Sequence, residues 1–122
     1  IKKSTLEQVM ELSDVVVVML PLTPETNNLI DLDKLNMMKK GSIMINVSRG
    51  EVVDEVGVAK LVKKGHIKAV LDVVRDEPYV NPALLNIENL YITPHIAGYT
   101  EEANTNIAVV AVNNFLNSQK TI

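Results

Sequence analysis

The chain has 122 residues, 47% of them hydrophobic and 22% charged, and a formal net charge of −3. These values are typical of one globular domain with its own core, and they exclude a disordered chain and a strongly basic nucleic-acid-binding protein. The sequence has no cysteine and only two histidines, far apart in the chain, so it predicts neither a disulfide nor a metal site. No apolar run approaches the roughly 20 residues of a membrane span, and the first residues lack the apolar core of a signal peptide. The default expectation is a cytoplasmic protein without a membrane or nucleic-acid partner.

Helix and strand signals begin near the start of the chain. Ser4 with Glu7 three residues later has the spacing of a capping box, and apolar residues follow at helical intervals. The run VVVVML at 15–20 then predicts the first strand. Thr23 followed by Pro24 has the pattern of a helix N-cap with proline at the first helical position, so a second helix is expected there.

The middle of the chain continues this alternation. Asp31 or Asp33 is expected to cap a short helix that ends at Gly41, and the run SIMINV at 42–47 predicts the second strand. The segment VDEVGVAKLVKKG repeats the helical pattern and is expected to stop at Gly65.

The last part of the chain adds two strands and a long helix. KAVLDVV at 68–74 and LYIT at 90–93 predict the strands, and Thr100 followed by two glutamates opens a helix expected over 101–117. All four strand-like runs are nearly continuous and β-branched rather than alternating, which favours parallel strands covered on both faces. The predicted fold class is therefore α/β, with right-handed crossovers, a parallel sheet and helices outside it.

Polar or conformationally special residues follow each strand-like run, in the stretches PLTPET, SRGE, RDEP and PHIAG. In open parallel sheets, ligands bind at the carboxyl ends of the strands. These four stretches are therefore the candidate functional site.

Four side chains in or beside these stretches can do chemistry. Arg49 follows the second strand, and its guanidinium can hold a carboxylate through two parallel hydrogen bonds, although a solvated loop arginine is the alternative. Asp72 lies within the third strand, where an unpaired carboxylate is unfavourable, so it should accept a hydrogen bond from a ligand or from the protein. Glu77 and His95 follow neighbouring strands and can pair, although each alone is also consistent with an ordinary loop or core residue. Such a pair fixes the imidazole tautomer and favours its protonation.

Together these residues suit the reduction of a carbonyl that lies next to a carboxylate. The arginine would orient the anionic substrate, and the histidine would give or take a proton near neutral pH. No side chain supplies a hydride, so a cofactor has to be the donor.

Three blocks, NVSRGEVVDE, LDVVRDEP and TPHIAG, resemble in this order the signature blocks of the D-isomer-specific 2-hydroxyacid dehydrogenases. This family includes phosphoglycerate, D-lactate and glycerate/hydroxypyruvate dehydrogenases. SDVVVVMLPLTPET and LDKLNMMKKGSIMINV fit the same family, so the resemblance covers nearly the whole chain. It implies a Rossmann-like sheet and hydride transfer between NAD(P)H and a 2-keto or 2-hydroxy acid of D configuration.

The resemblance also implies a role for each site residue. Arg49 would bind the carboxylate and carbonyl of the substrate, Glu77 would pair with the histidine, and His95 would be the general acid. Asp72 would contact the nicotinamide carboxamide. The other residues expected to line the cofactor groove are Pro21, Thr26, Val47, Ser48, His95 and Gly98.

The sequence departs from the family pattern in two places. Val74 and Arg75 stand where the family commonly has an aromatic and then often an acidic residue, which would reshape the mouth of the site or favour another substrate. The Gly-x-Gly-x-x-Gly turn that receives the pyrophosphate is absent, because the five glycines stand at 41, 50, 57, 65 and 98. We therefore expect residues 1–122 to be the second half of the cofactor domain, without its glycine-rich half and the substrate domain, and to be weakly active or inactive alone. The helix at 101–117 would lead back toward the substrate domain, and the strand at 15–20 would be an apolar edge that favours self-association.

Several questions stay open at the level of sequence. NAD is the expected cofactor, with NADP not excluded because the residue that reads the ribose lies upstream, and the particular acid is undetermined. The parent protein is expected to be a homodimer. The alternatives are a formate, phosphite or erythronate-phosphate dehydrogenase of the same family and, from another class, a non-catalytic NAD-binding regulatory relative such as a corepressor.

Overall fold

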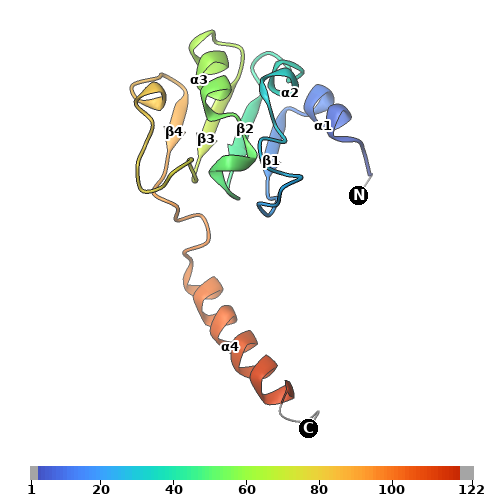
Figure 1. The fold of residues 1–122 in the computed structure, drawn as a ribbon, viewed down its shortest axis with the longest axis vertical. Coiled ribbons are helices and arrows are strands. Elements are labelled where there is room, and N and C mark those ends of the chain that lie inside the picture. Colours follow the sequence, from blue (N-terminus) through green and yellow to red (C-terminus); the bar gives the residue numbers. More distant parts are fainter. Residues whose placement is uncertain (1–2, 119–122) are drawn as a thin grey trace.

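Four parallel strands form the sheet of this protein, in a computed structural model that describes residues 3–118. Within that range the sheet order is β1–β2–β3–β4, the order of the sequence (Figure 1). The strands are β1 (Val15–Val18), β2 (Ile43–Asn46), β3 (Lys68–Leu71) and β4 (Leu90–Ile92). The predicted α/β class with a parallel sheet is confirmed, and each strand ends before its apolar run does.

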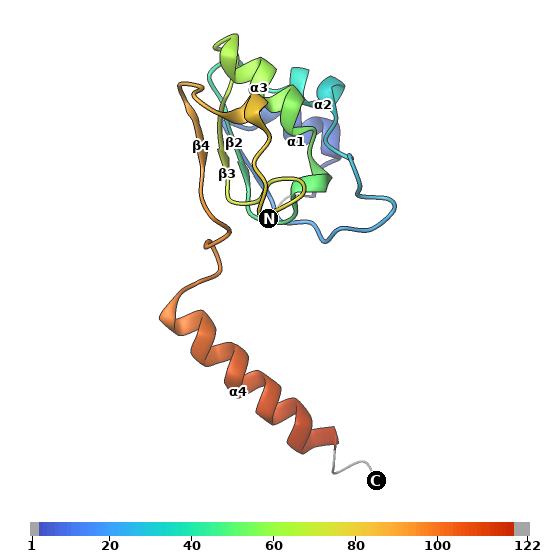
Figure 2. The same ribbon diagram turned by 60° about the vertical axis from the view of Figure 1, so that its left-hand side comes forward.

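The helices between the strands all cover the same face of the sheet. Because each strand lies beside the previous one in a constant direction, every right-handed crossover falls on one side. Figure 2 shows these helices on one side of the sheet and the other side bare. The α-helices are α1 (Leu6–Leu12), α2 (Leu32–Asn36), α3 (Glu55–Lys63) and α4 (Glu101–Ser118), and two 3₁₀ turns are η1 (Gly50–Val52) and η2 (Pro82–Leu84).

Exposure of the strand residues alternates, so the prediction of strands covered on both faces is wrong for the described residues. In β1, Val16 and Val18 are 5% and 3% exposed, whereas Val15 and Val17 are 49% and 51% exposed. β2 and β3 show the same alternation. The β-branched runs suit two-sided burial, but the crossovers of the described chain supply only one layer of helices.

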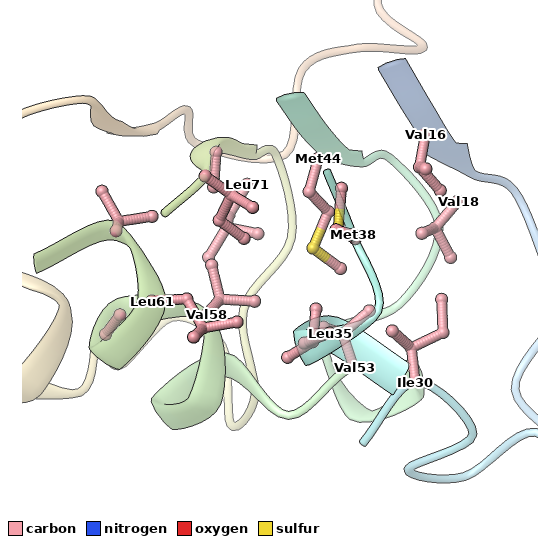
Figure 3. Packing of buried hydrophobic residues seen from close by; sticks show 14 of the residues in the cluster. Val16, Val18, Ile30, Leu35, Met38, Met44, Val53, Val58, Leu61 and Leu71 are labelled. Carbon is pink, nitrogen blue, oxygen red and sulfur yellow. The ribbon is translucent and has the colours of Figure 1, made fainter. Parts of the chain in front are cut away.

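The core lies between the sheet and α2 and α3. Met44 of β2 and Leu71 of β3 face Leu35 of α2 and Val58 of α3 (Figure 3). All four side chains are at most 1% exposed. Burial of each such side chain stabilises the fold by about 1.5–3 kcal/mol before the loss of conformational entropy is subtracted, so this layer fixes the sheet that carries the site.

Two of the predicted helix starts are wrong. The capping box of α1 is formed by Thr5 and Gln8, one residue after the predicted Ser4 and Glu7. Residues 24–28 form a turn rather than a helix: the amides of Thr26 and Asn27 donate to the carbonyl oxygen of Thr23. Asn28 then adopts a left-handed φ of 53°, which ends the turn.

The other capping signals mark helices correctly, with one helix shorter than expected. Asp31, not Asp33, caps α2 by accepting from the amide of Lys34 at 3.0 Å. The helix ends at Asn36 rather than at Gly41, whose φ of 84° belongs to the turn into β2. The end of α3 near Gly65, with φ of 65°, is confirmed.

α4 begins where the sequence predicts and projects away from the sheet (Figures 1 and 2). The hydroxyl of Thr100 accepts from the amide of Ala103 at 3.0 Å and caps the helix. Its large apolar side chains are all more than half exposed: Ile107, Val109, Val110, Val112, Phe115 and Leu116. In the described part of the chain, no helix is both long and apolar enough to cross a membrane.

Candidate active site

The loops that follow the four strands meet at one edge of the sheet, because the carboxyl ends of parallel strands all lie there. They carry every residue that the sequence singles out for chemistry. In Figure 1 this edge is the one from which the chain continues into α4.

His95 and Glu77 form the predicted pair. Nδ1 of His95 lies 2.8 Å from Oε2 of Glu77, and the side chains are 49% and 35% exposed. Oε1 of Glu77 accepts from the amide of Val74 at 3.0 Å. The hydrogen bond from His95 holds the pKa of Glu77 below its ordinary value; partial burial opposes this, and the Val74 amide and the charges of His95 and Arg49 lower it further. An ionised Glu77 fixes the proton on Nδ1 and leaves Nε2 to exchange a proton with a ligand.

Asp72 is the carboxylate behind this pair, and it is 3% exposed. Oδ1 accepts from the hydroxyl of Thr93 at 2.5 Å and from the amide of Ile96 at 2.9 Å, and Oδ2 accepts from the amide of Ala97 at 2.9 Å. Burial raises the pKa of Asp72, but these hydrogen bonds and the charge of His95 outweigh it, so that the pKa lies below its usual value. The sequence left open whether Asp72 would accept hydrogen bonds from a ligand or from the protein. In the structure its donors are Thr93, Ile96 and Ala97.

Arg49 lies beside the His95–Glu77 pair. Its side chain is exposed, and Nη1 donates to the carbonyl oxygen of Ser48 at 2.6 Å. Arg49, Glu77 and His95 line the same hollow, together with Gly50, Glu51, Val74 and Asp76. The guanidinium of Arg49 is the group in this hollow that can hold a carboxylate through two parallel hydrogen bonds. Among the described residues, no group of three or more His, Asp or Glu is placed to hold a metal ion.

The residues predicted to bind a cofactor line two hollows that share Val47. One is lined by Pro21, Val47, Ser48 and Arg49 together with Met19, Leu20 and Leu22. The other is lined by Val47, Asp72, His95 and Gly98, and by Tyr99, Asn104 and Ile107. Thr26 lines neither hollow. Its hydroxyl donates to the carbonyl oxygen of Pro21 at 2.6 Å and so fixes the position of Pro21 in the first hollow. Of the predicted residues, Val47 therefore lines both hollows, and Asp72, His95 and Gly98 lie together in the second.

Residues 1–97 match the family model described as D-isomer specific 2-hydroxyacid dehydrogenase, NAD binding domain. This chain belongs to the D-isomer specific 2-hydroxyacid dehydrogenase family. The match covers the sheet and the loops of the site up to His95, so the family predicted from the three sequence blocks is confirmed.

Individual proteins of the family give the same picture. The glyoxylate reductase of Pyrococcus furiosus is 40% identical over 112 residues, which cover 91% of this chain and 33% of that protein. The glyoxylate/hydroxypyruvate reductase B of an Enterobacter species is 42% identical over 115 residues, 93% of this chain and 36% of that protein. A crystal structure of an NADPH-dependent glyoxylate/hydroxypyruvate reductase from Sinorhizobium meliloti, in complex with NADP and malonate, superposes with a TM-score of 0.75 and 34% identity, over 81% of this chain and 31% of that one. The chain spans about a third of the length of the curated relatives it matches.

Three residues that support this candidate site were not identified from the sequence. Buried Asn46 holds the loop of Arg49. Buried Glu55, at the start of α3, accepts from the amide of Arg75 at 2.9 Å and so holds the loop of Glu77. A Cβ on Gly50 would lie 2.1 Å from the carbonyl carbon of Val74, so only glycine allows these two loops to approach. Polar residues within apolar stretches are the signal that could have identified Asn46 and Glu55.

Proposed function

We propose that the protein reduces a 2-keto acid, such as glyoxylate or hydroxypyruvate, to the 2-hydroxy acid, with D configuration wherever the product is chiral, and with NADH or NADPH as hydride donor. The observation that carries this proposal is the juxtaposition of Arg49 with the His95–Glu77 pair, since His95 also lines the neighbouring hollow with Val47 and Asp72. The names of the relatives, glyoxylate reductase and glyoxylate/hydroxypyruvate reductase, support this class of substrate.

Each side chain has a distinct task in this reaction. The guanidinium of Arg49 binds the substrate carboxylate and polarises the neighbouring carbonyl. His95, protonated on both ring nitrogens, donates the Nε2 proton to the carbonyl oxygen as the alcohol forms. Glu77 accepts from Nδ1 and stabilises the imidazolium before that transfer. The depressed pKa of Glu77 keeps the carboxylate ionised at neutral and mildly acidic pH.

We place the nicotinamide end of the dinucleotide in the hollow lined by Val47, Asp72, His95 and Gly98. Apart from Gly98 and its two chain neighbours, no heavy atom lies within 4 Å of the position that a Cβ on Gly98 would occupy. Bound NADH or NADPH would supply the hydride that the carbonyl carbon takes up. The NADP in the Sinorhizobium enzyme supports either dinucleotide as the cofactor of this family.

The test is turnover by the full-length protein. Oxidation of NADH and NADPH is followed with glyoxylate, hydroxypyruvate and pyruvate for the wild type and His95→Ala, and the reverse reaction compares D- with L-glycerate. We expect kcat of His95→Ala to fall about 10²- to 10⁴-fold, the usual contribution of a general acid. Arg49→Ala should raise KM for the keto acid and lower kcat, since Arg49 both binds the substrate carboxylate and polarises the carbonyl that is reduced.

His66→Ala is the matched control, because it removes the other histidine. Nε2 of His66 lies 2.9 Å from the carbonyl oxygen of Met38, outside the site, so this variant should keep kcat. Unchanged turnover in His95→Ala, or binding of NADH without reduction of any 2-keto acid, would contradict the proposal. Faster oxidation of L-glycerate than of D-glycerate would contradict the D configuration.

We further propose that residues 1–122 form part of an NAD(P)-binding domain, and that α4 leads toward the domain that completes the substrate site. The exposed apolar side chains of α4 and the length of the relatives support this arrangement. We expect the whole protein to be a cytoplasmic homodimer that acts on a small acid rather than on nucleic acid or a membrane. Light scattering during size-exclusion chromatography would measure the dimer directly.

A further inference from the structure

Asn46, the last residue of β2, is a buried polar residue three positions before Arg49, and it is 1% exposed. Its Nδ2 donates to the carbonyl oxygen of Arg49 at 2.9 Å. Its Oδ1 accepts from the amide of Ser48 at 3.0 Å and from the Ser48 hydroxyl at 2.8 Å. The carboxamide of Asn46 thus connects the end of β2 to both Ser48 and Arg49 in the loop that follows.

The same contacts reach the guanidinium. Nη1 of Arg49 donates to the carbonyl oxygen of Ser48, the residue whose amide and hydroxyl are held by Asn46. Asn46 therefore holds the backbone of Arg49 and also the residue, Ser48, whose carbonyl oxygen accepts from the guanidinium. An amide suits this place because it offers a donor and an acceptor at once, whereas a carboxylate offers only acceptors and an aliphatic side chain offers neither.

We propose that Asn46 is a positioning residue that sets the place of the Arg49 guanidinium and thereby the affinity for the substrate carboxylate. The kinetic consequence rests on the function proposed above. The structural consequence, an ordered loop at residues 47–50, does not.

The kinetic test compares Asn46→Ala, Asn46→Asp and Ser42→Ala in the full-length protein. Ser42 is the matched control. It is also buried, and it directly precedes β2, whereas Asn46 ends that strand. Its hydroxyl donates to the carbonyl oxygen of Lys39 at 2.7 Å. We expect kcat/KM for the keto acid to fall about 10- to 100-fold in Asn46→Ala, mainly through KM, since a displacement near 1 Å can have this effect. Ser42→Ala should keep both kcat/KM and the Kd for NADH within about twofold of the wild type.

Asn46→Asp keeps the shape of the side chain and both bonds from Ser48. The hydrogen bond from Nδ2 to the carbonyl oxygen of Arg49 is lost, because a carboxylate oxygen of the aspartate then faces that carbonyl oxygen. We therefore expect kcat/KM to fall in this variant too. Because Asn46→Asp changes so little volume, it serves if Asn46→Ala fails to fold.

A double-mutant cycle separates positioning from general destabilisation. If Asn46 acts through Arg49, then Asn46→Ala should change kcat/KM less than about twofold when Arg49 is already alanine, because the two effects share one cause. Additive losses in the double variant, or a loss no larger than that of Ser42→Ala, would overturn the proposal.

Hydrogen exchange of residues 47–50 provides a readout that does not need turnover. We expect faster exchange of the Ser48 amide in Asn46→Ala, which removes its acceptor, and no increase in Asn46→Asp, whose carboxylate still accepts from that amide, or in Ser42→Ala. Unchanged exchange in all variants would overturn the positioning role itself. Faster exchange in a protein whose wild type reduces no 2-keto acid would instead refute the proposed function and leave the role of Asn46 in the loop intact.

Discussion

Asp72 shows how a single buried charge shapes the site. Its carboxylate accepts three hydrogen bonds from the segment between Thr93 and Ala97, and its carbonyl oxygen accepts from the amide of His95 at 2.9 Å. His95 has a left-handed φ of 54°, a conformation that an L-residue keeps only when its surroundings hold it there. Asp72 therefore fixes the backbone that presents the imidazole.

Replacing Asp72 by asparagine should destabilise the fold by about 2–4 kcal/mol at pH 7. The carboxamide nitrogen would face a hydrogen-bond donor, and the remaining hydrogen bonds would go to a neutral oxygen instead of a carboxylate. The pKa of Asp72 is depressed in the fold, so its stabilising contribution is present above the ordinary value of 3.8 and is lost as pH falls through the folded value. Urea denaturation of both forms should thus show a difference that shrinks as the pH is lowered below 3.8. Asp33→Asn, an exposed carboxylate in α2, is the control; a difference for Asp72→Asn that does not change with pH would contradict this account.

The sequence predicted where the candidate site side chains would gather, but it did not indicate the residues that support them. Arg49, Glu77 and His95 stand just after strand-like runs, where any parallel sheet collects its ligand groups. Asn46 and Glu55 look like ordinary polar residues, since their function depends on burial and on partners that only the tertiary structure brings together.

At the scale of elements, the approach of the loops after β2 and β3 decides whether Arg49 and Glu77 share one hollow. Gly50 makes this contact: a Cβ there would lie 2.1 Å from the carbonyl carbon of Val74 and 2.3 Å from the amide nitrogen of Arg75. Both neighbours are backbone atoms, and the amide of Arg75 is already held by Glu55. The loops therefore have no side chain that can move aside, and an added methyl group has to separate them.

We expect Gly50→Ala to destabilise the fold by about 1–3 kcal/mol, the usual effect of overpacking, and to lower kcat/KM at least about tenfold in the full-length protein. Gly41→Ala is the matched control, since its φ of 84° makes alanine unfavourable there while the space around it is open. That variant should lose stability by about 1 kcal/mol and keep kcat/KM. Equal kinetic losses in the two variants would show that stability, rather than loop separation, governs activity.

Sequence signals located the elements better than they fixed their lengths. Thr23 and Pro24 carry the start signal of a helix, yet only one turn forms, because Asn28 leaves the helical region and no apolar repeat follows to pack a longer helix. The start of α4 was predicted correctly because Thr100 is followed by acidic residues and a long run of helix-compatible residues. Capping residues mark where a helix can begin, and packing decides how far it continues.

At the scale of the whole molecule, two apolar surfaces of residues 3–118 have no cover from the described chain. One is the bare face of the sheet, which includes Val15 and Val17 of β1. β1 is also an edge strand of the sheet. The other is α4, whose apolar side chains point in several directions around the helix. A helix that is apolar on most sides is normally buried between other elements, so both surfaces are expected to be covered in the whole protein.

Residues 1–122 expressed alone should therefore self-associate, and Val17→Lys should weaken this association, since a charge on an edge strand opposes pairing with another chain. Sedimentation velocity over a range of concentrations measures both effects. Leu85→Lys is the control, because it places the same charge at a position that is 49% exposed and outside the sheet. A monomer at every concentration, or equal effects of the two substitutions, would contradict the prediction. In the full-length protein the same Val17→Lys change should instead lower the free energy of unfolding by more than 1 kcal/mol, since a lysine would then have to be buried where a valine packs.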